Sequence, residues 1–215
     1  MKIGEHLSVQ DFELSMDAND PDQQTLNFRY PSCWSEAAGG YFGKFVRIEM
    51  GARSDTWPNE TLTVTPYVVE EFPKSFSTHA CPAHVLAAER TMWEKAALLH
   101  EENCRPTDKP VKARLSRHYS DVARLIETGV GNKALKDLQL LERVVEHRSV
   151  FFAYTWVDYD QMKPGTFKIV PRESRIPEWK ADYDKTREMF FEEPLPFEKV
   201  LETIVQFENR LNSLS

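Results

Sequence analysis

The chain has 215 residues, of which 41% are hydrophobic and 28% are charged, and its formal net charge is −7. This length and apolar content predict one folded domain or two tightly joined lobes, and they exclude a disordered chain. No apolar run approaches the ~20 residues of a membrane helix and the N-terminus lacks a signal-peptide segment, so we expect a cytoplasmic protein without a membrane span.

The N-terminal third of the chain is expected to contain most of the strands. Residues 5–16 place apolar side chains near helical spacing, which predicts a short first helix. Residues 25–30 and 44–50 then alternate between apolar and polar side chains, and residues 62–69 are rich in β-branched residues. We therefore predict an antiparallel sheet of at least three strands within residues 25–72, with an open edge unless another strand pairs with it.

From Pro82 the apolar residues take up a helical period. Their spacing of three and four predicts a helix that begins at Pro82 and carries Val85, Ala88, Met92, Ala96 and Leu99 on one face. Ser116 is a suitable N-cap for the next helix, which we expect to end before Gly129. Further helices are predicted over residues 133–148, around residues 179–183, and from Pro196 onward.

These elements predict an α+β fold. We expect a partial antiparallel or mixed sheet in residues 1–80, followed by a helical bundle lobe in residues 81–215. Cys33, Cys81 and Cys104 are too far apart in the sequence for a C-x-x-C metal knuckle, so they are expected to be free thiols.

Two charged residues share one face of the strand predicted at residues 44–50. Arg47 and Glu49 point to the same side because side chains alternate along a strand, and Gly51 just beyond them permits a close backbone approach. They are candidate site residues. The structural alternative is a surface Arg–Glu ion pair, which contributes ~0–1 kcal/mol.

Lys95 and Asp121 are the strongest candidates on the predicted helices. No acid lies three or four positions from Lys95, so its ammonium is available to hold a phosphate as a point charge. The alternative for Lys95 is a side chain whose stem lies on apolar surface while its head reaches water. Asp121, near the start of its helix, could instead simply favour the positive end of the helix dipole, paired with Arg117 or Arg124.

The neighbours of these two residues give weaker signals. His118 could orient Asp121 or contact phosphate, although a single histidine in such a position is more often a half-buried hydrogen-bonding residue. Glu89 and Arg90 are expected to be helix-surface charges or to support the site. Trp93 is expected in the core rather than as a platform for a base.

The charge of the chain is unevenly distributed. A net charge of −7 is unfavourable for an RNA substrate, since phosphate contacts are usually made by a basic surface. The stretch from Lys109 to Arg124 is nevertheless basic, and its only acid is Asp121. Two interpretations remain open for this stretch, a solvated loop and helix face or a phosphate-facing patch.

Several of these residues form an ordered series of motifs. The first is Glu89-Arg90-Thr91-Met92-Trp93-Glu94-Lys95, followed by Leu99-His100-Glu101 and by Arg117-His118-Tyr119-Ser120-Asp121. The later part of the series is His147, Phe151-Phe152, Trp156, Asp182-Tyr183, Met189 and Phe197-Glu198. From about Thr25 to its end, the chain resembles the AbiEii/AbiGii-type nucleotidyltransferase toxins, which belong to the polymerase β-like superfamily.

This resemblance implies an activity and a set of roles. The activity would be transfer of NMP from an NTP to an RNA acceptor such as tRNA, in a type IV toxin–antitoxin system or phage defence. Lys95 and Asp121 would be catalytic, and Lys95, Arg117 and Arg47 would bind the nucleotide. Glu49 would be a ligand of Mg²⁺. The implied partners are the nucleotide, tRNA and an antitoxin.

The resemblance also implies a Gly-rich turn followed by a D-x-D metal motif, and none is found before Glu49. Asp17, Asp20 and Asp22 fall in a polar loop that lacks such a turn. We therefore expect a transferase that is incomplete or truncated as it stands, which would associate with a missing N-terminal half or with itself through the open sheet edge. The alternative is a catalytically inert nucleotide- or protein-binding remnant of the fold.

Overall fold

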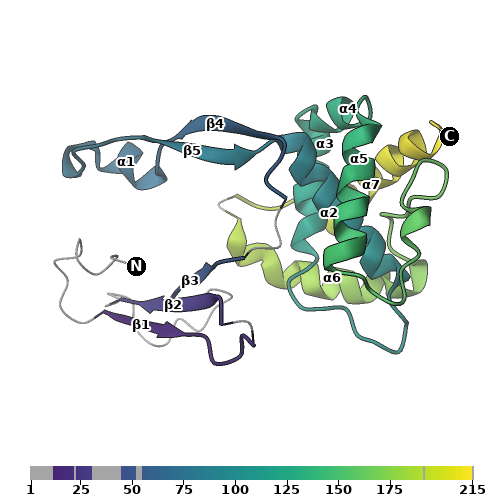
Figure 1. Cartoon of the computed structure of the whole chain (residues 1–215), viewed down its shortest axis with the longest axis horizontal. Coiled ribbons are helices and arrows are strands. Elements are labelled where there is room, and N and C mark those ends of the chain that lie inside the picture. The colour runs from purple at the N-terminus through teal and green to yellow at the C-terminus, as the bar shows by residue number, and fades with distance from the viewer. Residues whose placement is uncertain (1–11, 22, 31–44, 52–54, 191, 215) are drawn as a thin grey trace. The chain divides into compact units, whose positions relative to one another are not determined.

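The computed structural model describes residues 12–21, 23–30, 45–51, 55–190 and 192–214 (Figure 1). The chain divides into two compact units, Met1–Ser54 and Asp55–Ser215, and each is described by itself. Cys33 and residues 5–11 of the expected first helix lie outside the described residues.

The first unit contains a three-stranded antiparallel sheet in the order β1-β2-β3. Its strands are β1 (Glu13–Met16), β2 (Thr25–Arg29) and β3 (Val46–Glu49). The strands predicted at residues 25–30 and 44–50 are therefore confirmed. The helix predicted over residues 5–16 is wrong in its described part, because Glu13–Met16 pairs with β2 and its alternating side chains satisfy a strand.

The second unit begins with an antiparallel hairpin. Strand β4 (Asn59–Val64) pairs with β5 (Cys81–Leu86), and helix α1 (Tyr67–Glu71) and the 3₁₀ turn η2 (Pro73–Ser75) lie between them. Two predictions are thus wrong. The strand expected near residues 62–69 belongs to this second sheet rather than to that of β2 and β3, and the segment after Pro82 is strand, because β4 supplies its hydrogen-bond partners.

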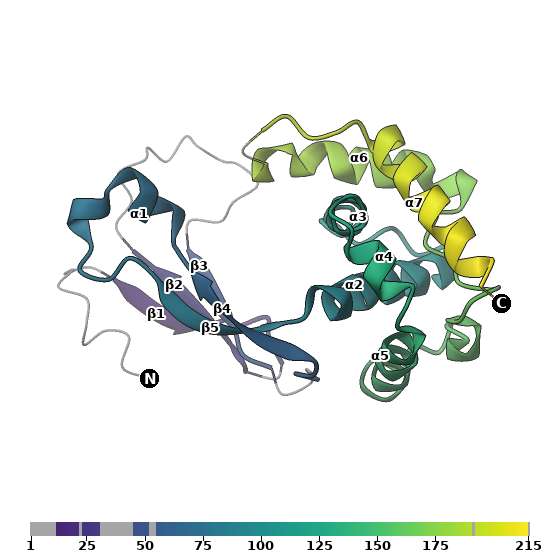
Figure 2. The same ribbon diagram turned by 90° about the horizontal axis from the view of Figure 1, so that it is seen from above.

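Helices make up the rest of the second unit, and α2 is central among them (Figure 2). Helix α2 (Ala88–Cys104) packs against α3 (Arg117–Glu127), α4 (Val130–Ala134) and α5 (Leu138–Phe151). Helices α6 (Ile176–Lys185) and α7 (Phe197–Asn212) follow, and α7 packs on α3. The 3₁₀ turns are η3 (Tyr159–Gln161), η4 (Glu173–Arg175) and η5 (Thr186–Met189). The predicted α+β class is confirmed.

The core of the second unit forms around aromatic side chains from several helices. Trp93 is fully buried, and its ring centroid lies 6.4 Å from that of Phe167 and 6.0 Å from that of Phe207. Tyr119 is also fully buried and meets the edges of Trp179 and Phe197. The expected core position of Trp93 is confirmed, and α7 closes the core around α2 and α3.

The helix starts differ from the sequence prediction in two places. Ser116 precedes α3 but its side chain makes no capping bond; the Asp182 carboxylate instead accepts hydrogen bonds from the backbone N–H groups of Arg114 (2.7 Å) and Ser116 (3.0 Å). The single helix expected over residues 133–148 is split into α4 and α5. Asp137 interrupts it and caps α5 by accepting from the Leu140 N–H.

Candidate functional site

Lys95 and Asp121 meet across two helices. Lys95 lies on α2 and Asp121 on α3, and the Lys95 Nζ donates a hydrogen bond of 2.7 Å to Asp121 Oδ2. The Lys95 side chain is one quarter exposed and that of Asp121 is 43% exposed. An incoming ligand can therefore reach this ion pair, in contrast to the nearby residues Trp93 and Ala96 of α2, which are buried.

His118 is the third member of this group. Its Nδ1 lies 3.3 Å from the Lys95 Nζ and 3.6 Å from Asp121 Oδ2. An ammonium has only donors, so Nδ1 accepts from Lys95 in the tautomer that leaves this nitrogen unprotonated, and it faces Asp121 as a donor in the tautomer that protonates it. In the first of these tautomers the imidazole and the carboxylate both hold the Lys95 ammonium, and the sequence contained only a weak signal for this role of His118.

The electrostatics of the group keep Asp121 charged. Burial acts to raise the pKa of the Asp121 carboxyl, but its neighbours His118 and Lys95 favour the charged form and lower the pKa below its ordinary value. The charged Asp121 carboxylate and the partly exposed Lys95 ammonium therefore form an ion pair.

Arg117 adds a second cation to the same helix. It is the first residue of α3, four positions before Asp121, and its side chain is half-buried. Helical spacing places the two residues on one face, yet Arg117 forms no ion pair or hydrogen bond with another described residue. Its guanidinium is therefore available for a phosphate.

Arg47 and Glu49 lie in the other unit, on β3. The Arg47 Nε is 3.2 Å from Glu49 Oε1, and its Nη2 is 3.1 Å from Asp17 Oδ2. Both side chains are at least half exposed, and both line a surface hollow of about 500 Å³ together with Asp20 and Thr25. The alternation of β3 thus brings together the two residues that the sequence predicted as neighbours.

The distribution of metal-ligating side chains bears on a magnesium site. Within the ranges that the structure describes, no group of three or more His, Cys, Asp or Glu side chains could hold a metal ion. Glu49 is paired with Arg47, which also contacts Asp17, so part of its charge is already neutralised. The described residues therefore do not complete a magnesium site.

Arg90 was expected at the helix surface or in support of the site, and the surface position is wrong. Its side chain is fully buried, because it donates to Glu94 (2.8 Å), to Asp55 (2.9 Å) and to the carbonyl oxygen of Trp57 (2.9 Å). Arg143 on α5 donates to the same Asp55 carboxylate at 2.7 Å. The hydrogen bond from Arg143 is the main cause that holds the pKa of Asp55 well below its ordinary value. Arg90 thus joins the first turn of α2 to the segment before β4.

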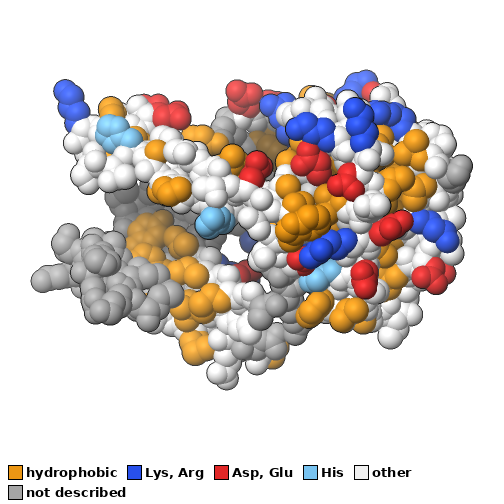
Figure 3. Space-filling model, turned by 45° about the horizontal axis from the view of Figure 1, so that its top comes forward, with side chains coloured by type: hydrophobic (Ala, Val, Ile, Leu, Met, Phe, Trp, Pro, Cys, Tyr) orange, Lys and Arg blue, Asp and Glu red, His pale blue; other side chains and the backbone are white. Residues whose placement is uncertain are grey.

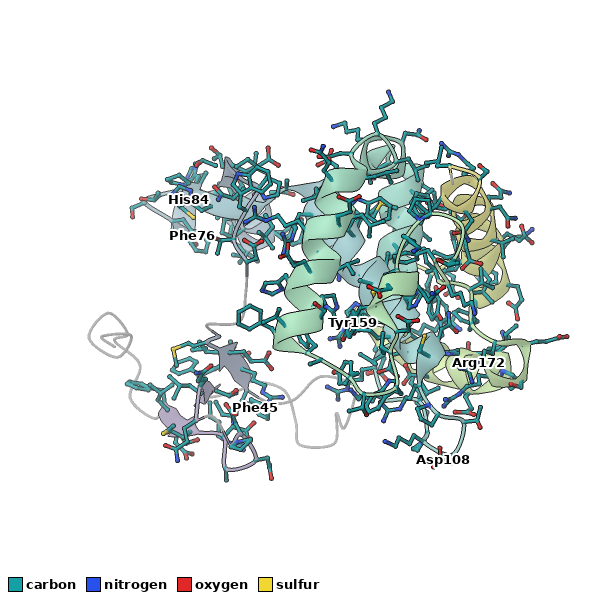
Figure 4. The ribbon with its side chains drawn as sticks, turned by 45° about the vertical axis from the view of Figure 1, so that its right-hand side comes forward. Phe45, Phe76, His84, Asp108, Tyr159 and Arg172 are labelled. Atoms are coloured by element: carbon teal, nitrogen blue, oxygen red, sulfur yellow. The ribbon has the colours of Figure 1, made fainter. Side chains whose placement is uncertain are left out.

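A buried ion pair at the other end of α2 was not foreseen. Arg148 on α5 binds both carboxylate oxygens of Glu101, at 2.8 and 2.5 Å, and the Tyr159 hydroxyl donates to Glu101 at 3.2 Å. The label of Tyr159 in Figure 4 marks where the 3₁₀ turn η3 meets this pair. The motif Leu99-His100-Glu101 drew attention to Glu101. Nothing in the sequence indicated that Arg148 is its partner.

Comparison with known proteins adds one match. A family model described as "Nucleotidyl transferase AbiEii toxin, Type IV TA system" matches residues 2–203, which is nearly the whole chain. No curated protein and no solved structure matches the chain. Among the helices that the structure describes, none is long and apolar enough to cross a membrane.

Proposed function

Because the chain belongs to the AbiEii family of nucleotidyl transferase toxins of type IV toxin–antitoxin systems, we propose that it transfers NMP from an NTP to an RNA acceptor such as tRNA. In this reaction a hydroxyl oxygen of the acceptor loses its proton to water and bonds to the α-phosphorus. The bond between that phosphorus and the oxygen bridging to the β-phosphate breaks, and pyrophosphate leaves. The role in phage defence and an antitoxin partner belong to the same proposal.

The observation that carries the proposal is the 2.7 Å contact between Lys95 and Asp121. These residues come from two separate motifs on two helices, and a purely local role would not require them to meet. Lys95 would neutralise charge on the triphosphate, and Arg117 would bind a second phosphate oxygen. Asp121 and His118 hold the Lys95 ammonium in place, so they act on the nucleotide through Lys95.

A divalent metal belongs to the proposal as a family expectation. When bound, Mg²⁺ would supply charge neutralisation to a phosphate, and the family resemblance suggests Glu49, on β3 of the first unit, as one ligand. The described residues do not complete such a site. Among the described residues, Lys95 and Arg117 are therefore the groups that we propose to position phosphate.

The test is incorporation of labelled NTP into tRNA with and without Mg²⁺, using each of the four nucleotides. Wild-type protein should label the RNA, and Lys95→Ala and Asp121→Ala should lower the rate at least about a hundredfold, as loss of a charge partner in an enzyme site does. Lys136→Ala, which changes an exposed lysine at the junction of α4 and α5, is the matched control.

Two outcomes would count against this assignment. If the wild-type chain labels RNA and the Lys95 and Asp121 variants label it equally well, the site is wrong. If the wild-type chain labels no RNA with any nucleotide but still binds NTP, the inert binding remnant is favoured instead.

A further inference from the structure

Two aromatic rings and three cations gather where the loop after α2 meets the segment after α5. The rings of Tyr154 and Trp156 are stacked, with centroids 4.8 Å apart and an interplanar angle of 19°. The Lys109 Nζ lies 4.6 Å from the Trp156 centroid, the Arg105 guanidinium 5.7 Å from it, and the Lys112 Nζ 5.4 Å from the Tyr154 centroid. We call these five residues the aromatic–cationic platform.

The platform belongs to the most basic part of the chain. Residues 105–117 contain Arg105, Lys109, Lys112, Arg114 and Arg117, and their only acid is Asp108, although the whole chain carries a net charge of −7. Asp108 is labelled in Figure 4, in the loop between α2 and α3. This concentration of positive charge predicts a polyanionic ligand.

Two acids near the platform, the buried Glu102 and the exposed Asp158, are engaged by neighbouring groups, whereas Asp108 is an exposed acid of the segment itself. Glu102 is buried, and its Oε1 lies 3.5 Å from the Arg105 Nη1 and 3.7 Å from the Lys112 Nζ, so it holds these two cations from the inner side. Asp158 caps the start of η3 by accepting a hydrogen bond from the Asp160 N–H. The outward charge of Lys109 and Lys112 is therefore not cancelled by a surface carboxylate at hydrogen-bond distance among the described residues.

Stacked half-exposed rings with cations on their faces suit single-stranded nucleic acid. Bases stack on aromatic side chains whatever their sequence, while lysine and arginine follow the phosphates. The Lys109 ammonium sits on a flexible stem, so a base can take its place over Trp156 while the ammonium moves to a phosphate. A protein partner fits less well, because lysine is depleted at the centres of protein interfaces.

The basic segment connects the platform to the Lys95–Asp121 site. Its far end enters α3 at Arg117, and its near end leaves α2 at Arg105. The rise of an α-helix puts Arg105 roughly 15 Å from Lys95 along the axis of α2. At about 3.4 Å per stacked nucleotide, this distance corresponds to about four nucleotides.

We propose that the aromatic–cationic platform binds the single-stranded 3′ tail of the acceptor RNA, a few nucleotides before the terminal hydroxyl that reaches Lys95 and Asp121. This inference rests on the proposed function, since it assumes an RNA acceptor. It adds the place where the acceptor is held and a requirement for an unpaired tail of about four nucleotides.

The experiment measures RNA binding without NTP, so that it does not depend on transfer activity. Fluorescence anisotropy of labelled RNA hairpins with 3′ tails of one and of five nucleotides compares the wild-type chain with Trp156→Ala and Lys109→Glu. We expect the five-nucleotide tail to bind at least about tenfold more tightly, and each variant to remove most of that difference. Lys109→Glu should also reduce the slope of log K against log salt by about one or more.

Two control variants separate binding from folding. Trp156→Phe keeps an aromatic face and should retain the preference for the long tail, and Lys136→Glu makes the same charge change away from the platform. Lys95→Ala should bind RNA normally while losing transfer, so a failure of the proposed catalysis is distinguishable from a failure of the platform. The platform is refuted if both hairpins bind equally, or if Trp156→Ala binds the long tail like wild type while remaining folded.

Discussion

The paired contacts of single side chains decide what the candidate site can do. Lys95 has no acid within reach on its own helix, so its partner had to come from another element, and that partner is Asp121. The motif pattern predicted both residues but not their distance. His118 was a weaker candidate. A single histidine beside an arginine has no sequence spacing that tells a residue supporting the site from a buried structural residue.

The position of His118 leads to a prediction about Lys95. His118→Ala should lower the transfer rate about tenfold, because the ammonium loses the Nδ1 acceptor 3.3 Å away. His118→Asn should retain most of the rate, because an amide oxygen can accept the same hydrogen bond. Steady-state NTP incorporation measures both variants, and equal losses in the two would contradict the role of Nδ1 as an acceptor.

His100 predicts a dependence of stability on pH. It is buried, its Nδ1 accepts from the Lys168 N–H, and burial lowers its pKa from 6.5 to about 4. Between these values the unfolded chain binds a proton that the folded chain does not, so stability is unaffected above pH 7 and falls as pH drops from about 6.5 towards 4. The loss should reach roughly 2–3 kcal/mol.

Urea unfolding at pH 7.5 and at pH 5 tests this effect. His100→Asn keeps an acceptor for the Lys168 N–H but cannot titrate, so its stability should fall less between the two pH values than that of wild type. The same fall in both proteins would show that His100 is not the group responsible.

At the scale of helices and strands, local pattern and tertiary partners compete. Val85 and Leu86 fit a helical period as well as a strand, and the strand forms because β4 lies alongside to pair with it. A sequence pattern contains no information about that partner. The segments with apolar residues at helical spacing were correctly predicted to be helices. Each of α2, α3, α6 and α7 buries such a face in the common core.

The start of α3 gives a prediction about one capping residue. Asp182→Ala removes the acceptor for two backbone N–H groups, of Arg114 and Ser116, and should cost about 2 kcal/mol of folding free energy. It should also reduce transfer, because Arg117 and Asp121 depend on the position of α3. Thermal unfolding measures the loss of stability, and NTP incorporation measures the loss of transfer. Normal transfer by a destabilised Asp182→Ala protein would show that the site does not depend on this cap.

The buried pair between α2 and α5 gives another prediction. Glu101→Ala leaves the Arg148 guanidinium buried without its carboxylate, and should destabilise the fold by about 3–5 kcal/mol. Replacing both residues by apolar side chains, as in Glu101→Leu with Arg148→Met, should restore much of that loss. Denaturant unfolding of the single and double variants decides this, and a double variant as unstable as Glu101→Ala would contradict it.

At the scale of the whole chain, the strands leave unpaired edges. In the described sheets, β1 and β3 are outer strands, and β4 and β5 each pair on one side only. Leu62 and Val64 of β4 are 47% and 43% exposed, and Figure 3 shows hydrophobic side chains at the surface of this hairpin. Such edges favour pairing with another chain.

We therefore predict that the isolated protein associates across micromolar concentrations in sedimentation. Leu62→Lys should weaken this association, whereas Thr63→Lys, on the other face of β4, should weaken it less. A protein that stays strictly monomeric at all these concentrations would show that the open strand edges do not cause association.

Family membership and fold class could be inferred from the sequence, because both depend on residue types in a fixed order. The contact of Arg90 with Asp55 could not, since it joins residues far apart in the chain and Asp55 lies in no recognisable motif. The same limit applies to Arg148, whose partner Glu101 is on a different helix. Long-range pairs of this kind require the fold before they become visible.

The packing of α7 also sets the order of events during synthesis. Phe197 and Phe207 of α7 complete the surroundings of Tyr119 and Trp93, so α2 and α3 leave the ribosome before the core that holds them exists. At the usual 5–20 residues per second, the 16 residues of α7 alone take about one to three seconds to translate. A nascent chain that already carries Lys95 and Asp121 therefore lacks part of the core that packs around α2 and α3 until α7 has been made.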